Sequence, residues 1–185
     1  MEIENYFGIS IPDAEAEKIY TVQLMVDSVA SHLHIKDDSL ELRDRVFQQV
    51  VQSFQALGWT REVIQLSDLV SAYVPSNEKR VWGDLENSLH LLIPEIPPTN
   101  NGNTRIIDKV KKLVNLPPAE KDDITMSRFV DAICANNYDF LIDKKNIKTT
   151  YEIYTAVSGI TVEKIGVDYY EMAPGKSFGS DLGID

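Results

Sequence analysis

Few residues of this 185-residue chain have the types and spacing that a reactive site requires. The single cysteine, Cys134, lies in the apolar stretch from Phe129 to Ala135, which is typical of a buried core residue rather than a nucleophile. The histidines His32, His34 and His90 lack the spacing to acidic partners that zinc needs. No local nucleophile–base pair is present. The sequence therefore predicts neither a catalytic centre nor a metal site.

Two serines lie at the predicted starts of helices. Ser39 lies in the string Asp38-Ser39-Leu40, and Ser76 precedes a predicted helix. Both positions also suit a helix N-cap, and Asp38 with Glu41 forms a possible capping box. We interpret both serines as helix caps.

The periodicity of apolar residues predicts the elements that position these side chains. Helical spacing recurs along the chain, whereas no segment alternates with period two for long enough to predict a sheet. The fold class predicted is all-α. The expected helices run over Val22 to Leu33 after the N-cap Thr21, Leu40 to about Leu57 before Gly58, Asn77 to about His90, Ile106 to Leu113, Ile124 to about Asn136, and Tyr151 to about Ile165.

Two segments of the chain repeat earlier ones in the same order. The run from Leu85 to Pro94 repeats the pattern of Ile3 to Pro12 without a gap, and Thr125 to Ile133 repeats Thr21 to Val29. Pro12 and Thr21 are 9 positions apart, whereas Pro94 and Thr125 are 31 apart, so the second copy carries 22 additional residues. Helices that share an apolar period can imitate one another, which is the alternative explanation.

The charge of the chain narrows the class of partner. Lys and Arg number 18 against 29 Asp and Glu, and the net charge is -11. This balance disfavours nucleic-acid binding, which depends on Lys and Arg neutralising phosphates. It suits docking on basic protein surfaces. No secretory signal and no apolar run of membrane-spanning length is present, so we expect a cytoplasmic protein.

The two ends of the chain carry related motifs. The tail reads Phe178-Gly179-Ser180-Asp181-Leu182-Gly183-Ile184-Asp185, and the head reads Phe7-Gly8-Ile9-Ser10-Ile11-Pro12-Asp13. An acidic turn with Glu15 and Glu17 follows the head motif, and Thr21-Val22 then opens a helix. The tail resembles the first part of an acyl carrier protein, and the head resembles the last part of the same family.

This resemblance implies a four-helix bundle whose attachment serine carries 4′-phosphopantetheine. That serine would follow Asp185, so the motif residues are Asp181, Leu182, Gly183 and Asp185, and Ser39 and Ser76 are weak alternatives. The resemblance further implies acyl thioesters held for fatty-acid or polyketide-type metabolism, with no enzymatic activity of the chain itself. Implied partners are a phosphopantetheinyl transferase and the basic surfaces of acyl-transfer or synthase enzymes. The acidic residues expected to dock there are Glu2, Glu4, Asp13, Glu15 and Glu17.

The middle of the chain resembles a degenerate copy of the same domain. We expect the C-terminal half of a carrier-like domain in residues 1–36, a degenerate carrier-like domain in residues 39–143, and the N-terminal half of a carrier-like domain in residues 147–185. Three hypotheses remain open: part of a longer or rearranged carrier with tandem copies, one bundle split across the termini, and a carrier-derived interaction module without a prosthetic group.

Overall fold

The structure, a computed structural model, describes residues 2–75, 79–95 and 124–183, and every regular element in that part of the chain is helical. The predicted all-α class is therefore confirmed. The elements are α1 (Glu2–Phe7), α2 (Asp13–Ala16), α3 (Val22–Leu33), α4 (Glu41–Ala56), η1 (Val70–Ala72), α5 (Lys79–Leu89), α7 (Met126–Asn136), α8 (Tyr138–Leu141), α9 (Thr150–Ile165) and η2 (Tyr169–Glu171). The predicted helix from Ile106 to Leu113 lies outside the described residues.

The N-terminal caps explain where several helices begin. The Thr21 hydroxyl accepts a hydrogen bond from the Leu24 amide at 3.2 Å, as its N-cap position predicts. Thr149 and Glu152 form a complete capping box at the start of α9. At α4 the predicted box of Asp38 and Glu41 is wrong.

At the start of α4 the N-cap position falls on Leu40, which has no capping side chain. The Ser39 amide donates instead to Asp37 Oδ1 at 2.9 Å, two residues back along the chain. This local bond forms a turn that competes with the capping geometry, so Asp37 rather than Asp38 organises the approach to the helix.

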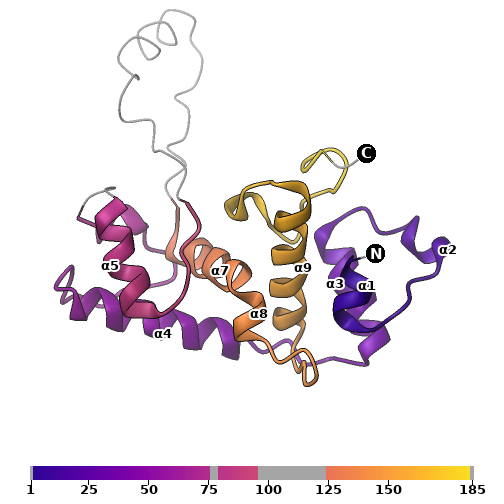
Figure 1. Cartoon of the computed structure of the whole chain (residues 1–185), viewed down its shortest axis with the longest axis horizontal. Helices are drawn as coiled ribbons and strands as arrows, with labels where there is room; N and C mark the ends of the chain where they lie inside the picture. Colours follow the sequence, from indigo (N-terminus) through magenta and orange to yellow (C-terminus); the bar gives the residue numbers. More distant parts are fainter. Residues whose placement is uncertain (1, 76–78, 96–123, 184–185) are drawn as a thin grey trace, which may run out of the picture.

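Helix α9 lies at the centre of the molecule (Figure 1). It packs against α3 and α1 on one side and against α7, α8 and α4 on the other. Its buried side chains surround the helix rather than forming one stripe, as expected for a helix with neighbours on opposite sides. The hypothesis of one bundle split across the termini requires the head helices to pack on the tail helix, and α1 and α3 do contact α9.

The apolar spacing of the helices expected in the middle segment predicts a core of Phe47, Val50, Phe54, Trp82, Leu85, Phe129 and Ile133. Most of these side chains are buried. Val50, Phe54, Leu85, Phe129 and Ile133 are fully buried, whereas Phe47 and Trp82 are partly exposed. The Trp82 and Phe129 rings lie with centroids 6.1 Å apart. Helix α4 contacts both α5 and α7, so the middle segment has its own cluster of packed helices.

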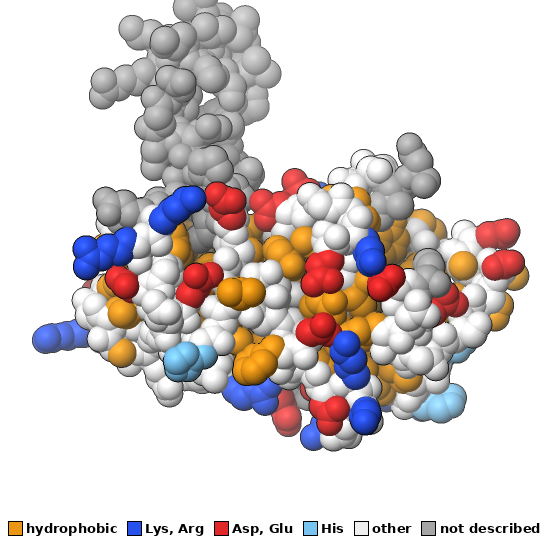
Figure 2. Space-filling view, viewed as in Figure 1, with side chains coloured by type: hydrophobic (Ala, Val, Ile, Leu, Met, Phe, Trp, Pro, Cys, Tyr) orange, Lys and Arg blue, Asp and Glu red, His pale blue; other side chains and the backbone are white. Residues whose placement is uncertain are grey.

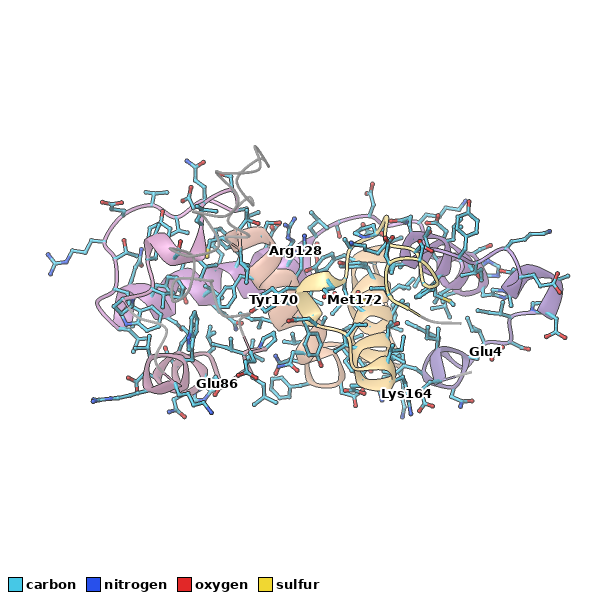
Figure 3. The ribbon with its side chains drawn as sticks, turned by 90° about the horizontal axis from the view of Figure 1, so that it is seen from above. Glu4, Glu86, Arg128, Lys164, Tyr170 and Met172 are labelled. Atoms are coloured by element: carbon cyan, nitrogen blue, oxygen red, sulfur yellow. The ribbon has the colours of Figure 1, made fainter. Side chains whose placement is uncertain are left out.

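The two sequence segments noted as repeats have matching local structure. The Ile11 amide donates to Glu4 Oε1 at 2.8 Å, and the Ile93 amide donates to Glu86 Oε1 at 2.9 Å. In each case a glutamate of a helix accepts from the amide seven residues ahead. Figure 3 labels the two glutamates, which lie far apart in the molecule. The Thr125 hydroxyl accepts from the Arg128 amide at 3.3 Å, as Thr21 does from Leu24.

The helix packing and loop pairing also correspond. Helix α9 contacts α3 and α1, and α4 contacts α7 and α5. An isolated antiparallel bridge joins Thr21 to Ser177, and another joins Leu69 to Thr125. The first group of elements, α1 to α3 with residues 149–183, is called the split unit below. The second, α4, α5 and α7 with their described connections, is called the middle unit.

Candidate functional site

The tail motif lies in a loop that is hydrogen-bonded to the start of α3. The Phe178 amide donates to the Tyr20 carbonyl at 2.9 Å, and the Val22 amide donates to the Lys176 carbonyl at 3.0 Å. These bonds flank the bridge between Thr21 and Ser177. The head and tail segments, far apart in sequence, therefore meet where the motif begins.

The described motif residues hold the shape of this loop. Asp181 Oδ2 accepts from the Ser177 amide at 2.8 Å, and the Leu182 side chain is buried in the core. Gly183 has a φ of +70°, in the left-handed region that favours glycine. These three residues form a closed turn at the end of the described tail. Asp185 lies outside the described residues.

Of the two weak attachment candidates, the structure describes Ser39 but not Ser76. The Ser39 hydroxyl oxygen is buried and finds no hydrogen-bond partner among the described residues, although the residue as a whole is half-exposed. The prediction that Ser39 caps a helix is wrong, because the N-cap position of α4 falls on Leu40 and the Ser39 hydroxyl binds no amide of the helix. Ser76 lies outside the described residues.

The predicted docking acids fall into two groups. Asp13 and Glu17 are exposed around α2, and Figure 2 shows acidic side chains over this outer end of the molecule. Glu2 is also exposed and pairs with Lys164 at 3.3 Å. Glu4 and Glu15 instead accept hydrogen bonds from groups of the chain itself, so one oxygen of each carboxylate is bound within the fold.

Glu15 links α2 to α3. Its carboxylate accepts a hydrogen bond from the Ser28 hydroxyl, and its second oxygen lies 3.2 Å from His32 Nε2. The Ser28 hydrogen bond, with a further contribution from His32, holds the pKa of Glu15 below its ordinary value. The carboxylate therefore binds these groups best when ionised.

We expect Glu15→Gln to lower stability at neutral pH and to have little effect in acid. A carboxyl whose pKa is depressed on folding stabilises the fold above its unfolded pKa, and this contribution is lost as the pH falls through its folded pKa. Urea midpoints of both proteins at neutral and acidic pH measure the difference. Glu17→Gln, in the same exposed turn, should change neither midpoint, and an equal loss from both variants would contradict the role of Glu15.

The histidines and the cysteine occupy structural positions. His32 faces Glu15, while His34 and His90 have φ values of 58° and 55° just beyond the ends of α3 and α5. Within the described ranges no cluster of three or more His, Cys, Asp or Glu could hold a metal ion. Cys134 is fully buried, and burial raises the pKa of its thiol to about 12. Its predicted place in the core is confirmed.

A polar network between α4, α7 and α9 was not predicted from the sequence. Asp131 accepts a hydrogen bond from the Tyr151 hydroxyl at 2.6 Å and pairs with Arg43 at 3.1 Å. Burial is the largest influence on Asp131 and raises its pKa. Two cavities, of about 240 and 250 Å³, adjoin this network and share Asp131, Tyr154 and Pro174 in their walls.

A short sequence match relates the chain to a known protein. A stretch of 32 residues is 59% identical to an acyl carrier protein of Rubrobacter xylanophilus. The match covers 17% of this chain and 40% of that relative. No family model matches the chain, and no solved structure matches it. The chain therefore resembles an acyl carrier protein over a short segment.

Among the described helices, none has the length and apolar content that crossing a membrane requires.

Proposed function

We propose that the split unit is a carrier domain that holds acyl groups as thioesters on a 4′-phosphopantetheine arm. One observation carries this proposal: the tail motif is hydrogen-bonded to the start of α3, next to the head segment that resembles the same family. The short match to an acyl carrier protein supports the same class. The chain itself then acts as a carrier and not as an enzyme.

The residues present fit the approach to the attachment site but do not include its hydroxyl. Asp181, Leu182 and Gly183 close a turn at the end of the described tail, and by the resemblance the family serine is expected after Asp185. The prosthetic group would supply the thiol that carries the acyl cargo. The chain's own contribution is the bundle core, the ordered loop and exposed acids such as Asp13 and Glu17, which suit weak docking on basic enzymes.

We further propose that the middle unit is a degenerate carrier copy that takes no prosthetic group. Thr21 pairs with Ser177 and the equivalent Thr125 pairs with Leu69, so Ser177 and Leu69 occupy equivalent positions in the two units. With the sequences aligned on these two residues, Glu78 corresponds to the residue after Asp185. In the family resemblance Met1 follows the serine by about eight residues, so aligning Pro94 with Pro12 instead gives Pro75 for that position. Neither residue has the hydroxyl that a phosphodiester requires, and the Asp-Ser-Leu signature is absent there.

The alternative function is a carrier-derived interaction module without a prosthetic group. One observation favours it for the chain as numbered: the hydroxyl oxygen of Ser39, in the single Asp-Ser-Leu string of the sequence, is buried. A mass measurement separates the two classes. The protein, extended beyond Asp185 by the family's serine-bearing helix, is incubated with coenzyme A and a phosphopantetheinyl transferase.

We expect the extended protein to gain the mass of one phosphopantetheine group. Changing the added serine to alanine should abolish the gain, because the phosphodiester forms on that hydroxyl. An extended chain that stays unmodified, while a known carrier in the same reaction is modified completely, would reject the carrier proposal and favour the interaction module.

A further inference from the structure

The loop of residues 166–183, which leads to the tail motif, is hydrogen-bonded to both units. Its later part pairs with Tyr20 and Val22 of the split unit, as described above. Its earlier part, around η2, lies against α7 of the middle unit. There Arg128 Nε donates to the Tyr170 carbonyl oxygen at 2.6 Å, and a second nitrogen of the same guanidinium also donates to it. Figure 3 shows Arg128, Tyr170 and Met172 close together.

Further contacts hold this part of the loop. Tyr170 and Met172 are 5% and 4% exposed, and the Tyr170 hydroxyl lies 3.4 Å from the carbonyl oxygen of Pro94 in the middle unit. The Tyr154 hydroxyl of α9 donates to the Met172 carbonyl at 3.2 Å. The loop backbone is thus bound by side chains from α7 and α9, while its own side chains enter the core.

The corresponding loop of the middle unit provides an internal comparison. The Tyr170 amide donates to Asp168 Oδ1 at 3.1 Å, and in the same register the Glu62 amide donates to Thr60 Oγ1 at 3.0 Å. Met172 likewise corresponds to Ile64, which is 5% exposed. The two loops therefore share one turn and one apolar anchor.

The two loops differ at the residue that Arg128 binds. Tyr170 is buried, whereas its counterpart Glu62 is exposed. Arg128 itself corresponds to Leu24 of the split unit, since the amides of both bind the threonine cap of their helix. The arginine and the buried tyrosine thus occur only on the side of the molecule where the loop continues into the tail motif.

We propose that Arg128 is a positioning residue by which the middle unit holds the motif loop of the split unit in place. This inference rests on the proposed carrier function. It assigns the degenerate copy a role: the middle unit is a scaffold that orders the approach to the attachment position. A guanidinium suits this role because two of its N–H groups can bind one carbonyl oxygen in a fixed geometry.

Hydrogen–deuterium exchange of the chain tests the contact directly. In Arg128→Gln, the amides of Glu171 and Met172, which are bonded within η2, should exchange about fivefold faster, because a charge-assisted bond to the loop is lost. The Phe178 amide, bonded to Tyr20, should keep its wild-type rate and so report that the fold is intact. Arg128→Lys should restore part of the protection, and Arg80→Gln, at an exposed arginine of α5, should change nothing.

The functional consequence is measured on the extended protein described above. Arg128→Gln should slow its modification by the transferase severalfold, and Arg80→Gln should not. Unchanged exchange at Glu171 and Met172, or faster exchange with an unchanged modification rate, would overturn the positioning role. An extended wild-type protein that is never modified would instead overturn the carrier proposal, while the exchange comparison would still report on the contact between Arg128 and the loop.

Discussion

Gly159→Ala will destabilise the protein by about 3 kcal/mol, because the centre of α9 has no room for a methyl group. A Cβ at this position would lie 2.5 Å from the carbonyl oxygen of Ala135 and 2.3 Å from Cδ1 of Tyr138. The Tyr138 ring can rotate away only in part, and the Ala135 backbone belongs to α7. Since α9 belongs to the split unit and packs on α7 of the middle unit, separating α9 from α7 weakens the junction between the two units.

A second helical glycine provides a matched control. Gly83, in α5, has no neighbouring atom within 4 Å of an added Cβ. Gly83→Ala should therefore stabilise the protein by about 1 kcal/mol, because alanine has the higher helix propensity. Urea unfolding of both variants measures the two changes. Shifts of the same sign would show that Gly159 does not mark a close helix contact.

Ile153→Ala should destabilise the protein by about 2 to 5 kcal/mol, the range for truncating a buried isoleucine. Ile153 is fully buried on α9 and belongs to the apolar core that includes Val22, Met25 and Val29 of α3. The loss should also appear as faster amide exchange in α3, since the head helices pack on the tail helix.

Ile165→Ala serves as the control at the end of the same helix. Ile165 is 38% exposed, so its truncation should cost well under the value for Ile153. If Ile153→Ala left the exchange of α3 unchanged while lowering overall stability, α3 would not depend on α9. The head and tail would then not form one unit.

Much of the fold could be predicted from local patterns. Thr21 and the apolar spacing after it predicted the start of α3 at Val22, and α7 begins at Met126, two residues after the predicted Ile124. Both starts could be predicted closely because capping and periodicity act within a few residues. The core positions Phe54, Leu85 and Phe129 were predicted for the same reason. The match between Ile3–Pro12 and Leu85–Pro94 corresponds to a recurring hydrogen bond of Glu4 and Glu86.

Other features depend on contacts that the sequence pattern does not reveal. The side-chain hydrogen bond before α4 was assigned to Asp38, whereas the adjacent Asp37 makes it. Whether such a residue forms a turn or a helix cap depends on backbone geometry, which the sequence pattern does not reveal. Glu15 binds His32, which is 17 positions away in the sequence. Because no local pattern reveals this contact, Glu15 was predicted to be a docking acid. Arg128 and Tyr170 are 42 positions apart, and no periodicity or motif links them.

The most direct test of the account is to locate the prosthetic group by peptide mass. The protein extended beyond Asp185 and the chain as numbered are each treated with coenzyme A and a phosphopantetheinyl transferase. Both are then digested, and the masses of their peptides are measured by mass spectrometry. We predict that the group lies on the serine that follows Asp185, and that the chain as numbered gains none. A group on Ser39 or Ser76 in either protein would contradict both the assignment of the tail motif and the degenerate character of the middle unit.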